Sequence, residues 1–245
     1  MRLWFDIPLL IKIDIITIYY ISFNIKMSTV KNICKKYKIT YNIEMETYVK
    51  EINDIMNGNM NTTDNDELLR WYGLYCYHVI EDYAAMEKYY LMASERGNIN
   101  AMCSLGCYYE YIQKYAEMIK YYLMAIEHGS SCAMNNLAIY YEDNKDYSTP
   151  KKLYLMAIEH GNIDAMNNLA EYYRCIVEYE MMKKYYIMAI KNKHIGSMFR
   201  LGTFYYNSKN YKMAKKYFCM VITHGCMEDI YEKYIQLYKF NIYVL

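Results

Sequence analysis

The sequence is built around two short blocks, Lys152-Leu-Tyr-Leu-Met-Ala157 and Ala165-Met-Asn-Asn-Leu-Ala170. Versions of the first block begin every 32 residues, at Lys88, Lys120, Lys152, Lys184 and Lys216. The second block keeps the same period and begins at Ala101, Ala133, Ala165 and Ser197. Two blocks that hold one register over five units indicate a tandem structural repeat.

Each unit predicts two helices. In the first helix, Ala165, Leu169 and Tyr173 recur at i, i+4 and i+8, which forms an apolar stripe along one helical face. The second helix is expected over about residues 115–128 in its unit. The chain has only 2 Pro, as long helices require.

The predicted helix ends recur as well. Capping residues stand before the second helices at Asp82, Asp146 and Asn210. Glycines that can take the left-handed conformation end them, namely Gly97, Gly129, Gly161 and Gly225. Pro150 falls in a first turn, where its missing N–H costs little. Small residues that let a neighbouring helix approach closely stand at Gly106, Ala138, Ala170 and Gly202.

One hairpin of this kind cannot bury its apolar face by itself, whereas stacked neighbours share a continuous core. The sequence therefore predicts an all-α fold, a right-handed α-solenoid of antiparallel helix-turn-helix repeats with a 32-residue period. We expect the repeats over 67–225. A leading segment at 28–58 contains an amphipathic helix at 44–57, and 226–245 contains a C-terminal capping helix.

Residues 1–27 form an apolar N-terminal extension with two interpretations. Asp6, Lys12 and Asp14 interrupt it, and the uninterrupted run from Ile15 to Ile25 is too short to span a bilayer. A signal peptide is disfavoured because no small-residue cleavage site follows. The extension is either dispensable, with Met27 as an alternative start, or an anchoring or packing segment.

Composition limits the function classes. Hydrophobic residues make up 55% and aromatic residues 17% of the chain, enough to bury a core. The net charge of +1 and the lack of a long basic run disfavour nucleic acid as a partner.

The 8 Cys contain no CxxC pair, which is typical of reduced thiols in a cytoplasmic protein. Cys103 and Cys107 are spaced i,i+4, but without a second ligand pair we interpret them as structural and expect no metal.

No residue constellation predicts catalysis. Glu-His pairs occur at 127–128 and 159–160, and His224 occupies the matching position. A histidine at a helix C-terminus is explained by the helix dipole and the last carbonyls, and a feature that recurs with the repeat does not single out one site. Since no phosphate loop, nucleophile elbow or HExxH motif is present either, we expect no enzyme activity and no cofactor.

A lysine and a methionine also recur at fixed positions in every unit. The lysine that begins each first block is either a solvated helix position or part of a basic ladder facing an acidic partner. The methionines at 92, 124, 156, 188 and 220 are either core filler or an adaptable binding surface.

The pattern small–x3–Leu–Gly/Ala–x2–Tyr, followed by Tyr–x6–Tyr–x3–Ala and Gly, resembles the tetratricopeptide superfamily. The sequences of Ala133–Tyr141 and Leu153–Met166 are most similar to Sel-one-like repeats, although the usual insertion between the two helices is missing. The amino-acid composition, rich in Tyr, Ile, Asn and Lys, also resembles that of repeat proteins of giant DNA viruses. This likeness in composition reflects AT-rich coding sequences.

This resemblance implies a non-catalytic adaptor whose first helices line a concave groove. Carried over by position, the expected partner-binding residues are Asn100, Ser104, Asn135, Asn136, Glu142, Asp164, Asn167, Asn168, Glu171, Phe199, Arg200 and Thr203. Paired Asn amides can donate to and accept from an extended peptide. The alternative is that these Asn are ordinary solvated helix residues.

We therefore predict a protein–protein interaction scaffold that grips a peptide or helix of its partner proteins. The expected protein is a monomer in the cytoplasm, or in the host cytoplasm if viral, with a membrane as an unlikely partner. The alternative is a membrane-associated structural or assembly protein anchored by residues 2–25.

Overall fold

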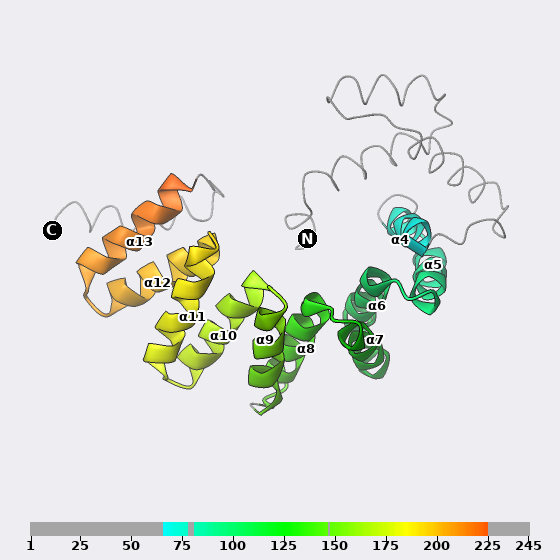
Figure 1. Cartoon of the computed structure of the whole chain (residues 1–245), viewed down its shortest axis with the longest axis horizontal. Coiled ribbons are helices and arrows are strands. Elements are labelled where there is room, and N and C mark those ends of the chain that lie inside the picture. Colours follow the sequence, from blue (N-terminus) through cyan, green and yellow to red (C-terminus); the bar gives the residue numbers. More distant parts are fainter. Residues whose placement is uncertain (1–65, 78–80, 147, 225–245) are drawn as a thin grey trace, which may run out of the picture. The chain divides into compact units, whose positions relative to one another are not determined.

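The computed structural model describes residues 66–77, 81–146 and 148–224. These residues form ten α-helices and no strand (Figure 1). The helices are α4 (Asp66–Tyr75), α5 (Tyr83–Glu95), α6 (Ile99–Tyr111), α7 (Tyr115–Glu127), α8 (Ser131–Asp143), α9 (Thr149–Glu159), α10 (Ile163–Cys175), α11 (Tyr179–Lys191), α12 (Ile195–Asn207) and α13 (Tyr211–Thr223). The predicted all-α repeat fold is confirmed. The segments at 1–27, 28–58 and 226–245 lie outside the described residues.

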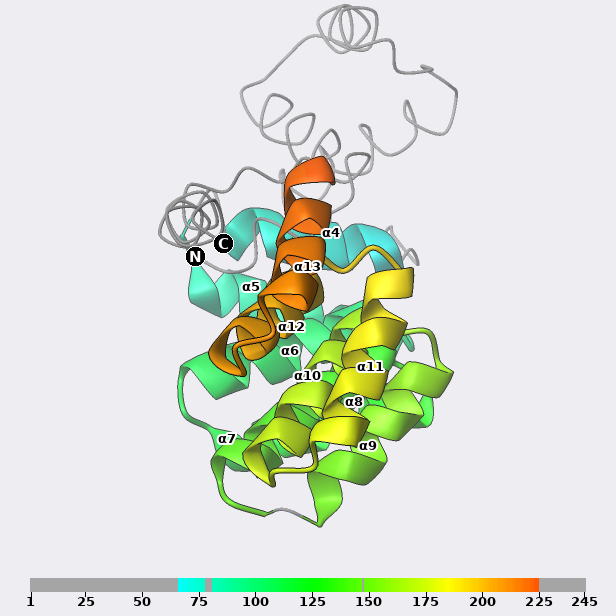
Figure 2. The ribbon, with the colours of Figure 1, turned by 90° about the vertical axis from the view of Figure 1, so that its left-hand side faces the viewer.

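The chain divides into two compact units, one up to Tyr121 and one from Tyr122 onward. The second unit contains the hairpins α8/α9, α10/α11 and α12/α13, and α10 and α11 run alongside each other in Figure 2. Each hairpin also packs on the next one, through α9 against α10 and through α11 against α12. In the first unit α4 packs against α5, and α5 against α6. We call α4, α6, α8, α10 and α12 the first helices and their partners the second helices.

Tight turns join the helices of a hairpin, as the sequence spacing predicted. After α10, for example, the N–H of Val177 donates to the carbonyl of Arg174 (3.1 Å) and that of Glu178 to the carbonyl of Tyr173 (2.9 Å). This closure places one residue in the left-handed region. The residues in that position are Glu81, Gln113, Lys145, Val177 and Lys209, with φ between 57° and 65°.

Three of the second helices end at the predicted glycines. Gly97, Gly129 and Gly161 have φ values of 89°, 84° and 81°. Lys193 takes the same position after α11 with φ 63°, and Gly225 lies outside the described residues. Left-handed backbone favours glycine because it has no Cβ, so the sequence pattern identified these ends correctly.

The predicted caps are confirmed at two of three second helices. Asp82 accepts a hydrogen bond from the N–H of Ala85 (2.9 Å), and Asn210 accepts one from Met213 (3.2 Å). Asp146 was placed wrongly as a cap, because α9 begins later, at Thr149. The Asp146 carboxylate instead holds the turn that leads into this helix. Pro150 lies in the first turn of α9, as predicted.

The core is built from positions that repeat. Tyr122, Tyr154 and Tyr186 occupy equivalent sites and are among the largest fully buried side chains. The small residues Gly106, Ala138, Ala170 and Gly202 are all buried in the first helices. At Gly202 an added Cβ would lie 2.7 Å from a ring carbon of Phe218. Close approach of the two helices of a hairpin therefore depends on a small residue there.

No helix within 66–77, 81–146 and 148–224 is both long enough and apolar enough to cross a bilayer. The apolar segment 2–25 lies outside these residues.

Candidate functional site

Six of the predicted partner-binding residues lie on one stripe of the first helices of the second unit. In α10, Asp164, Asn168 and Glu171 are spaced i, i+4 and i+7; α8 contributes Asn136 at the second of these positions, and α12 contributes Arg200 and Thr203 at the second and third. Each is half-buried or exposed. We call this stripe the polar face, made of Asn136, Asp164, Asn168, Glu171, Arg200 and Thr203. Asn100 and Ser104 hold the matching positions on α6 of the first unit, where Asn100 is exposed and Ser104 half-buried.

The paired asparagines form a hydrogen-bonded ladder across three repeats. The Ser197 hydroxyl donates to Asn167 (3.0 Å), whose amide donates to Asn168 (3.2 Å). The Asn168 amide donates to Asn135 (2.9 Å), which in turn donates to Asn136 (3.4 Å). All four bonds run in one direction, so each group polarises the next. We call these five residues the asparagine ladder.

The ladder changes the interpretation of the Asn pairs. Asn135 and Asn167, the first member of each pair, are only 7% and 8% exposed. Their amides join neighbouring helices and are turned away from solvent. The second members, Asn136 and Asn168, are half-buried at the edge of the polar face. Of these four predicted asparagines, Asn136 and Asn168 are therefore the two that remain partly exposed.

Two other predicted residues point toward the second helices. The Tyr154 hydroxyl of α9 donates to a Glu142 carboxylate oxygen at 2.8 Å. Burial raises the pKa of the Tyr154 hydroxyl and also that of the Glu142 carboxyl. Phe199 lies with its ring centroid 5.9 Å from that of Phe218 in α13. Glu142 and Phe199 thus each contact a second helix, although the charge of Glu171 on the polar face also acts on Glu142.

A charged cluster lies at the centre of the polar face. Glu171 accepts a hydrogen bond from Nε of Arg174 (2.8 Å) and forms an ion pair with Nη1 of Arg200 (3.0 Å). The Glu171 side chain is 17% exposed, whereas those of Arg174 and Arg200 are 51% and 50% exposed. One partly buried carboxylate therefore orients two guanidinium groups that keep donors toward solvent.

The N-caps of the first helices are a recurrent feature that the sequence analysis did not identify. Asn98, Ser130, Asn162 and His194 each accept a hydrogen bond from the backbone N–H three residues later. They stand 32 residues apart, so the repeat register contained the signal. In three of them a second atom reaches the preceding first helix. Asn98 donates to Asp66 and Glu67 (both 2.8 Å), and Asn162 donates to the Ser131 carbonyl (3.2 Å).

The third inter-repeat cap is a histidine. His194 Nδ1 accepts from the Ser197 N–H (3.0 Å), and Nε2 lies 3.3 Å from Oδ1 of Asp164. The hydrogen bond with His194 lowers the pKa of Asp164. In the first unit burial acts to raise the pKa of Glu67, but its hydrogen bonds with Arg70 and Asn98 lower it below the ordinary value. Asn98, Asn162 and His194 therefore join consecutive repeats and also cap the N-termini of the first helices.

The recurrent lysines have intramolecular contacts. The ammonium groups of Lys88, Lys120, Lys184 and Lys216 lie 5.1–5.9 Å from the ring centroid of the tyrosine that follows each in sequence. Three of those tyrosines stack on a tyrosine of the preceding first helix, as in Tyr173–Tyr185 with interplanar angle 6°. Lys152 precedes Leu153, and Lys151 lies over Tyr173 instead (5.5 Å). These contacts favour the solvated, stem-packed interpretation of the lysines.

The other recurrent groups have structural contacts. Nδ1 of His224 lies 2.9 Å from the Met220 carbonyl, as expected for a histidine at a helix C-terminus. The methionines at 92, 124, 156, 188 and 220 are all half-buried. Cys76, Cys103, Cys107, Cys132, Cys175 and Cys219 form no disulfide. Within the part of the chain that the structure describes, no group of three His, Cys, Asp or Glu residues could hold a metal ion.

Comparison with solved structures finds helical-repeat proteins. A protective antigen of uropathogenic Escherichia coli strains with an SLR fold is 19% identical (TM-score 0.56); the match covers 66% of this chain and 39% of that protein. A Sel1 repeat protein from Oxalobacter formigenes is 20% identical (TM-score 0.60), with 75% and 84% covered. Pseudomonas aeruginosa PilF is 12% identical (TM-score 0.56), with 78% and 96% covered.

These likenesses establish the fold. They confirm the resemblance to Sel-one-like and tetratricopeptide repeats that the repeated blocks indicated. The chain spans well under half of the Escherichia coli antigen. No protein-family model and no curated protein sequence matches the chain.

Proposed function

We propose that this chain, which has the helical-repeat fold of Sel1-repeat and tetratricopeptide-repeat proteins, is a non-catalytic scaffold for other proteins. A peptide or helix of the partner binds along the first helices, on the polar face. The observation that carries this proposal is the register of that face, because the equivalent positions Asn136, Asn168 and Arg200 of three successive first helices are all polar and at least partly exposed.

The chemistry of the polar face suits an extended peptide with an acidic residue. Asn136 and Asn168 offer amides that can both donate and accept, as a peptide backbone requires. Arg174 and Arg200, held by Glu171, offer guanidinium donors that match a carboxylate. The asparagine ladder fixes the amides in place, which lowers the entropy lost when a partner binds.

A capture experiment tests the proposal. The full chain is immobilised and used to recover proteins from its native setting, in parallel with the double variant Asn136→Ala/Arg200→Ala. Both residues lie on the polar face and neither is fully buried, so the variant is expected to fold. We expect partners that the unmodified chain captures to be reduced at least tenfold with the variant, equivalent to about 1.4 kcal/mol of binding free energy.

A matched control changes the opposite side of the repeats. Lys184→Ala/Lys216→Ala removes exposed side chains from two second helices and should leave capture unchanged. Equal capture by the polar-face variant and the unmodified chain would count against the polar face. Partners lost with the lysine variant alone would assign the function to the second helices and support the basic-ladder hypothesis.

A cytoplasmic location, or host cytoplasm for a viral protein, stays part of this proposal. The six described cysteines are thiols, which suits a reducing compartment. Membrane association through residues 2–25 remains the alternative, and it concerns residues outside those described.

A further inference from the structure

The turn between α10 and α11 departs from the other hairpin turns. Val177 has φ 65°, in the left-handed region that β-branched residues rarely adopt, and its side chain is 64% exposed. The equivalent residues are polar or charged, namely Glu81, Gln113, Lys145 and Lys209. Its neighbours Ile176 and Tyr179 are 40% and 43% exposed.

The start of α11 carries two carboxylates. Glu178 is its N-cap residue and makes no side-chain capping bond, as is also the case for Ser148 before α9. Glu180 is 88% exposed and pairs with Lys183 of its own helix. We call residues 176–180 the knob, an exposed apolar tip that also carries two carboxylates. An exposed β-branched residue in left-handed backbone breaks a local rule, and such a break points to a functional contact.

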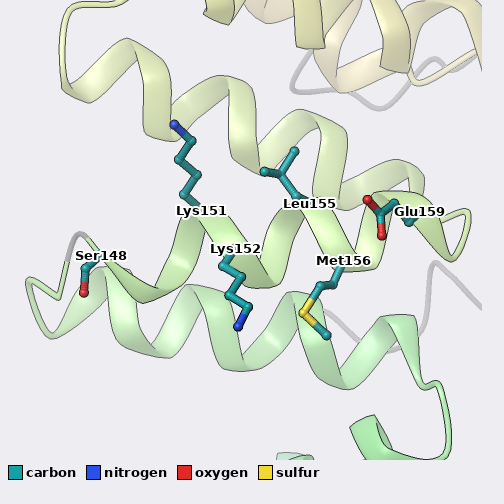
Figure 3. A pocket seen from close by; sticks show the side chains of 6 residues that line it. All are labelled: Ser148, Lys151, Lys152, Leu155, Met156 and Glu159. Atoms are coloured by element: carbon teal, nitrogen blue, oxygen red, sulfur yellow. The ribbon is translucent and has the colours of Figure 1, made fainter.

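The outer surface of α9 carries a depression of about 370 Å³ (Figure 3). Its lining residues are Ser148, Lys151, Lys152, Leu155, Met156 and Glu159. In Figure 3 the two lysines project to opposite sides of the helix, with Leu155 and Met156 one turn further along. The depression therefore combines the apolar Leu155 and Met156 with two lysines, one on each side of α9, and with the carboxylate of Glu159 at the other end of the lining.

Knob and depression are complementary and adjoin each other within the second unit. The knob offers apolar side chains with Glu178 and Glu180, and the depression offers Leu155 and Met156 with its lysines. They lie on neighbouring elements, because Lys151 reaches over the ring of Tyr173 in the last turn of α10, and the charge of Glu178 acts on Lys151. When two copies of the chain are related by a two-fold axis that passes between these adjoining features, the knob of each copy faces the depression of the other copy.

We propose that two copies of this chain associate by placing the knob of each in the α9 depression of the other. The occupant is a second copy because the chain itself supplies both halves of the contact with opposite charges. Each half is small compared with the roughly 800 Å² per partner of a standard interface, so dissociation constants of about micromolar or weaker are expected. The inference does not depend on the polar face, and it replaces the monomer expected from the sequence.

Sedimentation velocity of the full chain over a concentration series tests the proposal. We expect the unmodified chain to move from one copy to two as the concentration rises. Val177→Gly should remain a single copy, since it removes the knob side chain. Glycine also suits the left-handed backbone, so the variant is expected to fold at least as well as the unmodified chain.

Lys209→Gly is the matched control, because it makes the same exchange at the equivalent position of the next hairpin. It should dimerise as the unmodified chain does. An unmodified chain that stays a single copy at every concentration overturns the proposal. Equal association by Val177→Gly overturns it as well, as does loss of association with Lys209→Gly.

A charge exchange checks the geometry. Lys152→Glu and Glu180→Lys should each weaken self-association, because each places like charges at both contacts. Mixed together, the two variants should associate again, since the mixed pair has opposite charges at both contacts. Failure of the mixture to associate while each variant remains folded would contradict the proposed pairing of knob and depression.

Discussion

Asn168 of α10 donates a hydrogen bond of 2.9 Å to the side-chain oxygen of Asn135 in α8, 33 residues earlier. This bond joins two repeats through a nearly buried acceptor. It forms the middle of the asparagine ladder, which ends at Ser197 of α12, a residue with no solvent exposure. The asparagines of the second block are therefore part of the interface between repeats, and only their outer members remain at the polar face.

The asparagine ladder should show energetic coupling. Asn135→Ala and Asn168→Ala are each expected to lower the free energy of unfolding by about 1–3 kcal/mol, because each leaves a poorly solvated partner without its bond. The double variant should lose about 0.5–1.5 kcal/mol less than the sum of the two. Urea unfolding of all four proteins measures this difference. Asn135→Ala combined with Asn210→Ala, which share no partner, should be additive, and strict additivity in the ladder pair would contradict coupling.

Tyr186 and Tyr154 should respond in opposite directions to the loss of their hydroxyl groups. The Tyr186 hydroxyl is buried without a hydrogen-bond partner, whereas that of Tyr154 donates to Glu142. Tyr186→Phe is expected to raise the free energy of unfolding by about 1 kcal/mol, and Tyr154→Phe to lower it by about 1–2 kcal/mol. The next repeat already has Phe218 at this position. Thermal and urea unfolding decide the matter, and destabilisation by Tyr186→Phe would show that its hydroxyl is satisfied.

Gly202→Ala should overpack the α12/α13 hairpin. The new Cβ would lie 2.7 Å from the Phe218 ring, so we expect a loss of about 1–3 kcal/mol in the free energy of unfolding. Gly161→Ala is a useful comparison, since nothing lies within 4 Å and the cost there comes from φ 81°. Adding Phe218→Leu should reduce the cost of Gly202→Ala and leave that of Gly161→Ala unchanged. A similar effect at both glycines would argue against steric overlap.

Protonation of Asp146 should make the free energy of unfolding depend on pH in the acid range. Hydrogen bonds from the Thr149 and Ser148 side chains hold its pKa at about 2, below the ordinary value of 3.8. A carboxyl whose pKa is depressed in the folded state contributes stability above its unfolded pKa and loses it as pH falls through the folded pKa. The loss should therefore occur between about pH 4 and pH 2.

Carboxyl NMR titration measures the pKa of Asp146 directly. Thr149→Val removes one hydroxyl donor and should move this pKa toward 3.8. Asp146→Asn removes the titrating group, so its unfolding free energy should fall less steeply over the same pH range. An unchanged pKa in Thr149→Val would mean that the Thr149 hydroxyl does not bond the carboxylate.

Local features were predictable because they depend on residues close in the chain. The positions of Gly97, Gly129 and Gly161, the Asp82 and Asn210 caps and the tight hairpin turns all follow from a few adjacent side chains. The start of α9 was misplaced because Asp146 has the chemistry of a cap, yet the helix begins only at Thr149. The caps Asn98, Ser130, Asn162 and His194 were readable in the repeat register but stand outside the two blocks.

The sequence by itself determined the helical repeat and its period, because the apolar pattern of each unit depends only on helical geometry. Only the tertiary structure decided which asparagines face a neighbouring helix and which reach solvent. Asn135 and Asn136 are adjacent in the chain, and their different burial follows from where α10 packs against α8. The same holds for Val177, whose exposure and left-handed backbone become evident only when the hairpin is folded.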